Sequence, residues 1–438
     1  MPEPLTNGRI FRFWLPLLGT WMLMAIDGPL LTALIARMVD AKLNLAAYGV
    51  AFSFALVAEA PIIMLMSAST SLASNPLAYR RLRRFTAVLT SLITLGFLVF
   101  LIPPVYTLVM ERLVGLSPAI ANHTHWALLA LLPWPAAIGW RRFYQGILIR
   151  SGQTPLVAFS TVFRLAGMAG CGFWLFSRAD VPGALLGGMA LSCGVLAEFV
   201  ASRFLARRAI AGVLASPQAG EVLSYPALWR YYLPLALTPF ITLGVQPLVI
   251  FFLGKGRMPL ESLAVMPVLA ALTFIFRAIG LSFQEVAIAL LGRDLRGYLP
   301  MRNFAWGLAL FASGALMCIA LTPLAPLWLH QVSGLNPELV RFSRLPLILM
   351  ALLPAGSVLS SFQRGVLMEG RVTRPISTAT IVEATVIFGI LTLLLLYSSW
   401  SGALCAAMAY VVGRLMAILW MVYPCRLVLA REAVGRSC

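Results

Sequence analysis

Apolar stretches long enough to cross a lipid bilayer follow one another along almost the entire chain. A helix rises about 1.5 Å per residue, so roughly 20 apolar residues span the hydrocarbon core of a membrane. Of the residues, 61% are hydrophobic and only 11% are charged, whereas soluble domains carry about 25% charged residues. This pattern excludes a soluble globular protein and predicts an all-α integral membrane protein.

Twelve transmembrane helices are predicted where apolar windows are bounded by charge, proline or glycine. The first window follows a short polar lead and has no small-residue cleavage site, so we expect a membrane span there rather than a removed signal peptide. The spans lie near residues 12–35, 45–70, 85–110, 125–148, 155–177, 183–205, 230–253, 262–290, 303–329, 342–367, 375–398 and 401–425.

The net charge of +18 would suggest a nucleic-acid partner in a soluble protein. Here most basic residues fall between spans, so they are interpreted as topology signals and no nucleic-acid partner is expected. With the N-terminus inside, 22 basic residues lie in inner segments and 8 in outer segments, which places both termini in the cytoplasm. Those assigned to inner segments include Arg141, Arg142 and Arg364.

The sequence repeats itself at a period of about 219 residues. The hexapeptide at 12–17 returns at 230–235, and the tetrapeptide at 145–148 returns at 364–367. Each half holds an even number of spans, so the two halves form a parallel repeat. We therefore predict two six-helix lobes joined by a cytoplasmic linker, with boundaries at 1–205, 206–228 and 229–438.

Charged side chains deep inside the predicted spans are the best functional candidates, because a charge that faces lipid costs a few kcal/mol. Asp27 stands two residues before Pro29, and a proline inside a helix frees a backbone carbonyl. A carboxylate beside freed carbonyls suits a proton or Na⁺. We predict Asp27 and Glu59 as coupling-ion residues; the alternative for Asp27 is a helix cap or a structural pair. Pro29 and its counterpart Pro247 are predicted helix breaks.

Three pairs of equivalent positions in the two halves carry opposite charges. One hypothesis is that some of these residues pair between lobes and exchange partners as the lobes rock. The alternatives are static pairs inside each lobe, or basic members that bind an anionic substrate. The pairs are Arg164 with Glu383, Glu59 with Arg277, and Glu198 with Arg414, the last displaced by about one helical turn.

Trp134 stands between Pro133 and Pro135, which predicts a broken helix lining a cavity. The histidines and cysteines show no metal-ligand spacing, and no HExxH, GxSxG or Walker A motif is present, so neither a metal site nor an enzyme is predicted. The residues predicted to line a substrate cavity are Arg164, Arg277, Glu383, Glu198, Arg414 and Trp134.

Several short motifs resemble the multidrug and toxic compound extrusion (MATE) superfamily, and within it the progressive ankylosis proteins. They are Ala25-Ile26-Asp27 and the segments 45–51, 146–148, 234–237, 247–249 and 261–285. The resemblance implies an exporter working by alternating access, in a family linked to efflux of pyrophosphate, nucleotide and citrate-type anions. The chain departs from that family after Asp27, where it is more apolar, and it lacks the long acidic tail.

The sequence thus favours a secondary active exporter of a small organic or phosphorylated anion, with no cofactor beyond coupling to H⁺ or Na⁺. The alternatives are cation-coupled efflux of drugs or cationic metabolites, and a flippase for lipid-linked saccharide. We expect a monomer with a small-molecule substrate, and the arginine-rich, lysine-poor composition suits a bacterial inner membrane.

Overall fold

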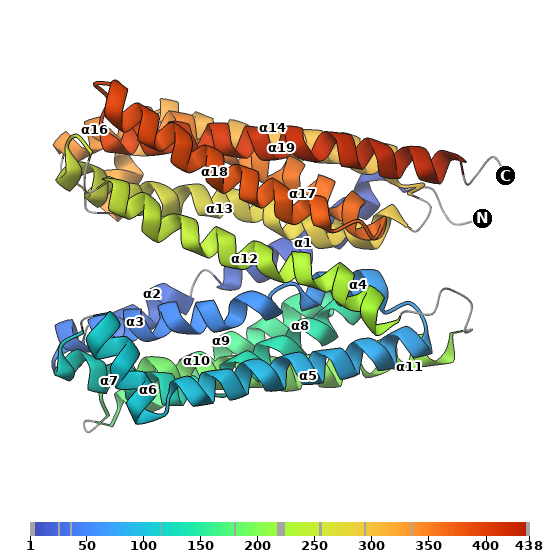
Figure 1. Cartoon of the computed structure of the whole chain (residues 1–438), viewed down its shortest axis with the longest axis horizontal. Coiled ribbons are helices and arrows are strands. Elements are labelled where there is room, and N and C mark those ends of the chain that lie inside the picture. Colours follow the sequence, from blue (N-terminus) through green and yellow to red (C-terminus); the bar gives the residue numbers. More distant parts are fainter. Residues whose placement is uncertain are drawn as a thin grey trace. The chain divides into compact units, whose positions relative to one another are not determined.

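The computed structural model of the chain describes residues 5–24, 27–35, 37–114, 116–178, 181–216, 224–253, 256–292, 295–333, 335 and 337–434. All regular structure in these residues is helical (Figure 1). Residues 217–223 of the predicted linker, and Ala25 and Ile26 of the first motif, lie outside them. The remainder of the linker includes a short helix, α11 (Arg207–Ala215).

The first half of the chain contains α1 to α11. Their bounds are α1 Asn7–Met24, α2 Asp27–Ile35, α3 Ala41–Glu59, η1 Ala60–Ile62, α4 Leu65–Leu72, α5 Pro76–Phe100, α6 Pro103–Thr107, η2 Leu108–Leu113, α7 Pro118–Ala130, α8 Trp134–Arg150, α9 Thr154–Phe176 and α10 Gly183–Leu205. The bounds in the second half are α12 Tyr225–Leu253, α13 Pro259–Leu291, α14 Tyr298–Leu321, α15 Leu324–Pro326, η3 Leu327–Val332, α16 Pro337–Met350, α17 Leu353–Glu369, α18 Arg374–Tyr397 and α19 Gly402–Val434.

Every predicted span coincides with helix in the structure. Within the described residues, nine helical segments are long and apolar enough to cross a membrane. The other three predicted spans correspond to α1 with α2, to α7 with α8, and to α12. The prediction of an all-α membrane protein is confirmed.

Prolines shape these helices in different ways. The predicted break at Pro133 is present, because α7 ends at Ala130 and α8 begins at Trp134. The predicted break at Pro247 is absent, because α12 is continuous through this residue. Pro29 is the third residue of α2, where the missing N–H of a proline costs no helical hydrogen bond.

The internal repeat extends to unusual local structure. Wide π-helical turns are rare, yet one occurs at Leu108–Leu113 and another at Leu327–Val332, 219 residues later. The turn after α8 places Gly152 at φ 76°, and the equivalent turn after α17 places Arg371 at φ 56°. Two irregularities of this kind at one offset support the repeat more strongly than matched hydropathy does.

Tertiary contacts divide the chain into two compact units, which we call the N-terminal unit (Gly19–Tyr232) and the C-terminal unit (Met1–Leu18 with Leu233–Cys438). These boundaries differ from the predicted lobes. Residues 1–18 belong to the C-terminal unit, and the N-terminal unit extends through the predicted linker to Tyr232. Trp14 of α1 donates to Ser282 Oγ at 2.8 Å in the C-terminal unit. Its counterpart Tyr232 of α12 donates to the Pro61 carbonyl at 2.6 Å in the N-terminal unit. The first parts of α1 and α12 therefore pack with the unit that the other half of the sequence forms.

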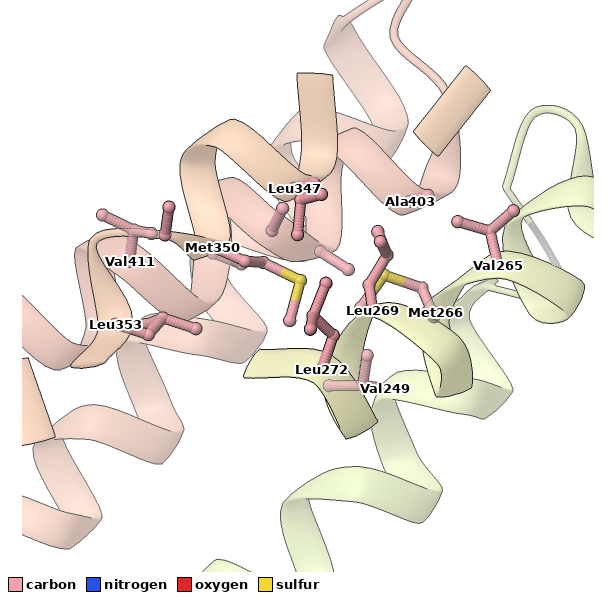
Figure 2. Close-up of a cluster of buried hydrophobic side chains, with 14 of the residues drawn as sticks. Val249, Val265, Met266, Leu269, Leu272, Leu347, Met350, Leu353, Ala403 and Val411 are labelled. Atoms are coloured by element: carbon pink, nitrogen blue, oxygen red, sulfur yellow. The ribbon is translucent and has the colours of Figure 1, made fainter. Parts of the chain in front are cut away.

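An apolar cluster fills one part of the C-terminal unit (Figure 2). In Figure 2, Leu347 and Met350 of α16 point toward Leu269 and Leu272 of α13. The cluster also includes Val249, Val265, Met266, Leu353, Ala403 and Val411. Arg414 lies three residues past Val411 on α19, and Arg277 lies five residues past Leu272 on α13. This packing therefore holds the helices that carry the two arginines.

Candidate functional site

Close packing of α9 on α10 brings the first group of buried charges together. A Cβ at Gly194 would lie 2.8 Å from the Arg164 carbonyl oxygen, so only glycine lets the two backbones approach this closely. Glu198 lies one turn beyond Gly194 on α10. Its carboxylate is therefore held on the face that meets α9.

Glu198 is fully buried and accepts hydrogen bonds from two helices. Its Oε2 atom receives Arg141 of α8 at 2.5 Å. Its Oε1 atom receives Gln145 of α8 at 3.0 Å and Thr161 of α9 at 2.9 Å. Arg164 adds a longer ion contact to Oε2, at 3.8 Å. These contacts compensate the cost of burying the carboxylate.

Arg164 also joins Glu198 to Asp27. Its Nη2 atom lies 2.5 Å from Asp27 Oδ2, and both side chains are less than a tenth exposed. Its guanidinium carbon lies 5.9 Å from the ring centre of Trp134, within the range of a cation–π contact. The structure thus brings together four residues predicted from the sequence: Asp27, Arg164, Glu198 and Trp134.

A second ion pair in this unit joins Glu59 of α3 to Arg142 of α8, with 3.5 Å between Oε1 and Nη2. Both residues are buried. We call the six residues the neutral network, because three carboxylates face three guanidinium groups. They are Asp27, Glu59, Glu198, Arg141, Arg142 and Arg164.

Assigning Arg141 and Arg142 to a cytoplasmic loop was wrong, because both are buried in the middle of α8. Topology counting treats every arginine near a span end as a loop charge, whatever face of the helix it occupies. One signal was available: both residues fall inside the predicted span 125–148, well before the glycine at 152 that ends the helix.

The C-terminal unit repeats the geometry with the charges inverted. Arg414 of α19 lies 2.9 Å from Glu383 Oε1 of α18, measured from Nη2. Its Nη1 atom lies 3.4 Å from Ser360 Oγ of α17. Gly413 permits this approach, because a Cβ there would lie 3.0 Å from the Glu383 carbonyl oxygen. Gly413 and Glu383 are the counterparts, 219 residues later, of Gly194 and Arg164.

Two further arginines lie near this pair. Arg277 of α13 donates to Ser357 Oγ at 3.2 Å, and Arg364 of α17 donates to Thr380 Oγ1 at 3.5 Å. Both interact electrostatically with Arg414 and Glu383. The topology count also places Arg364 in a loop, which is wrong, because this residue lies inside α17. Among the described residues, neither Arg277 nor Arg364 has a carboxylate within 4.0 Å.

We call Arg277, Arg364, Arg414 and Glu383 the cationic cluster, because three guanidinium groups accompany one carboxylate. Its N-terminal counterpart is neutral for an identifiable reason. Arg364 stands where the first half has Gln145, and Ser360 stands where it has Arg141. Glu285, another buried acid, lies two turns beyond Arg277 on α13, about 12 Å along the axis, and has partners of its own.

The ion pairs of the described residues favour one of the three explanations for the inverted charges. Arg164, Glu198 and Glu59 find partners inside the N-terminal unit, and Glu383 pairs with Arg414 inside the C-terminal unit. These are pairs within each lobe. The excess of guanidinium groups in the cationic cluster keeps the third explanation, anion binding, open for that unit.

The architecture defines a class: a polytopic helical membrane protein of two repeated units, each with charged groups among its helices. Its fold is that of MATE transporters. A MATE protein in a bent conformation matches with a TM-score of 0.75 at 14% identity, over 97% of this chain and 96% of that chain. A mutant of the Vibrio cholerae MATE transporter VcmN matches at 0.74 and 15% identity, over 98% and 97%. The eukaryotic MATE transporter AtDTX14 matches at 0.71 and 13%, over 97% and 98%.

No protein-family model matches the sequence, and a search of curated proteins finds no relative. The likeness is therefore one of fold, and it confirms the MATE-like architecture predicted from the sequence. The narrower resemblance to progressive ankylosis proteins stays a prediction.

Proposed function

We propose that the chain is a secondary active exporter that moves a small organic or phosphorylated anion by alternating access, and that the cationic cluster binds the anion. The MATE fold, over nearly the full chain, supports transport rather than catalysis. The observation that carries the choice of an anion is the excess of guanidinium groups over carboxylates within the cationic cluster.

Charge balance is the physical basis of this proposal. Guanidinium groups inside a membrane protein are costly unless they are paired, and arginine is well suited to bind carboxylate and phosphate through two parallel hydrogen bonds. An anion with two negative charges would balance the two positive charges that Glu383 leaves uncompensated. The hydroxyl of Tyr410, one turn before Arg414, adds a further donor near Arg277.

The neutral network disfavours the alternative of a cationic substrate. Asp27, Glu59 and Glu198 each have an arginine partner, so a cation would have to displace a guanidinium group. For the same reason a coupling ion at Asp27 would compete with Arg164. Coupling to H⁺ or Na⁺ at Asp27 and Glu59 stays part of the proposal, together with a monomeric state, cytoplasmic termini and a bacterial inner-membrane location.

Proteoliposome transport assays test the substrate class. Citrate, pyrophosphate, ATP and cationic dyes are compared with and without H⁺ or Na⁺ gradients. Transport of at least one anion is expected; transport of dyes alone would overturn the proposal.

The same assay tests the coupling role of Asp27. Loss of gradient dependence in Asp27→Asn would support this role, and unchanged gradient dependence would exclude it.

The site is tested with Arg277→Gln. The substitution removes one charge-assisted contact, so the KM for the transported anion is expected to rise about tenfold or more. Arg302→Gln is the matched control, because Arg302 is an exposed arginine of α14 outside the cluster. An unchanged KM in Arg277→Gln, with normal expression and folding, would contradict the site.

A further inference from the structure

A basic cavity in the N-terminal unit plays no part in the two charge groups described above. It has a volume of about 610 Å³ and is lined by Arg80, Arg83, Arg84, Ala87 and Trp140. The arginines belong to the start of α5 and the tryptophan to α8. All three arginines are exposed, and among the described residues no carboxylate lies within 4.0 Å of them. Three cationic side chains therefore border the cavity, and none of the described carboxylates serves as their counter-ion.

The position of these arginines on α5 connects them to the lipid-facing surface. Arg80 and Arg84 are one turn apart, and the same face of the helix continues with Val88, Leu92 and Leu95. The three apolar side chains are 57%, 58% and 56% exposed. One stripe thus carries positive charge where the helix begins and apolar side chains over the following turns. A phospholipid has the same order, with a charged phosphate followed by acyl chains.

Trp140 closes the cavity on the side of α8. Its ring stacks on Tyr144 at 5.9 Å between centroids and meets Phe143 edge-on at 5.8 Å, so its position is fixed by packing. Tryptophan is enriched at the level of lipid headgroups, where it anchors membrane proteins. Arginines that serve only as topology signals need not converge on a cavity or continue a lipid-facing stripe.

We propose that this cavity binds the phosphate headgroup of an anionic phospholipid, whose acyl chains lie along the apolar stripe of α5. Arg80, Arg83 and Arg84 donate hydrogen bonds to the phosphate oxygens. Bound phosphate also relieves the repulsion between these arginines and the positive N-terminal end of α5. The same phosphate chemistry could be supplied by free inorganic phosphate, which has no chains to place on Val88, Leu92 and Leu95.

The test uses the purified full-length chain in zwitterionic detergent micelles. Thermal unfolding is followed while phosphatidylglycerol, cardiolipin, phosphatidylcholine or inorganic phosphate is added. Ligands that bind only the folded protein raise the unfolding temperature. Phosphatidylglycerol and cardiolipin are expected to raise it; phosphatidylcholine and inorganic phosphate are not. An equal rise with phosphatidylcholine, or a rise with inorganic phosphate but not with lipid, would overturn the proposal.

Variants assign the effect to the cavity. Arg80→Gln/Arg84→Gln is expected to weaken binding of the anionic lipids about 30-fold, since each interfacial arginine contributes about 1 kcal/mol. The matched control is Arg208→Gln/Arg302→Gln, which removes two exposed arginines elsewhere. Both variants alter exposed side chains, so their unfolding temperatures without added lipid are expected to match the parent chain. Equal weakening in both variants would indicate attraction to total charge and would sink the proposal.

Discussion

Glu198 is the residue on which the neutral network depends most, because its fully buried carboxylate touches three other helical positions within 3.0 Å. Removing one partner from a buried ion pair is far more costly than removing both, since the remaining charge stays buried and uncompensated. The shortest of these contacts joins Arg141 Nη1 to Glu198 Oε2, at 2.5 Å. Its loss therefore tests whether the network holds the unit together.

Arg141→Met is expected to lower the free energy of unfolding by about 3–5 kcal/mol. The measurement is reversible unfolding of the protein in mixed micelles, with Arg302→Met as the exposed control. Adding Glu198→Met to Arg141→Met should recover part of the loss, because no unpaired carboxylate then remains and Arg164 keeps Asp27. A single Arg141→Met variant as stable as the control would show that Glu198 is satisfied without it.

At this scale the sequence identified several of the buried charges but not how they pair. Asp27, Arg164 and Glu198 lie in separate predicted spans, and hydropathy places each of them at membrane depth. Which guanidinium meets which carboxylate depends on helix rotation and on glycines such as Gly194, and neither is visible in an apolar window. Arg141 and Arg364 were missed because an arginine near a span end resembles a topology signal.

At the scale of elements, small residues decide how closely the charge-bearing helices pack. Gly194 and Gly413 stand at equivalent positions. Gly194 faces the backbone of Arg164, and Gly413 faces the backbone of Glu383. A Cβ at Gly413 would lie 2.5 Å from Ile387 Cγ1, so α18 and α19 would have to separate. The separation would lengthen the contact between Glu383 and Arg414.

Gly413→Ala is accordingly expected to destabilise the protein by about 1–3 kcal/mol, the usual cost of overpacking. Gly389→Ala on α18 is the matched control, because nothing lies within 4 Å of its added Cβ and alanine favours helix there. Unfolding temperatures of the two variants are compared in one detergent. If Gly413→Ala is no less stable than Gly389→Ala, the close approach of α18 and α19 does not exist.

Prolines show where the prediction of helix breaks succeeds and where it fails. The helix is interrupted at Pro133, where a second proline follows Trp134 and the backbone cannot continue the helical hydrogen bonds. A single proline at 247 leaves α12 continuous, as membrane helices often permit. The π-helical turns at Leu108–Leu113 and Leu327–Val332 carry no sequence signature of their own, and only the repeat links them.

For the whole molecule, the fold was within reach of the sequence because hydropathy and the repeat each act over many residues. The predicted orientation in the membrane does not depend on any single arginine. Moving Arg141, Arg142 and Arg364 out of the inner loops still leaves 19 basic residues in inner segments against 8 in outer segments. The boundary between the two units was not predicted, since it depends on Trp14 and Tyr232 packing with the opposite half of the sequence.

The distribution of charge between the units leads to a prediction about coupling. Glu383 and Arg414 are 2.9 Å apart inside the C-terminal unit, whereas Arg164 already has Asp27 and Glu198 as partners. Residues in direct contact show interaction energies of about 0.5–3 kcal/mol in double-mutant cycles, and independent residues show little. A cycle of charge reversals therefore distinguishes pairing within a unit from the hypothesis that Arg164 and Glu383 pair between lobes.

In that cycle, Glu383→Arg/Arg414→Glu is expected to recover much of the stability that either single reversal loses, with a coupling energy of about 1–3 kcal/mol. Arg164→Glu/Glu383→Arg should recover less than about 0.5 kcal/mol, because each reversal confronts unchanged partners in its own unit. Unfolding in mixed micelles supplies the free energies, and anion uptake into proteoliposomes supplies a second readout. Rescue of uptake by the second double variant but not by the first would favour exchange of partners between lobes over the pairing proposed here.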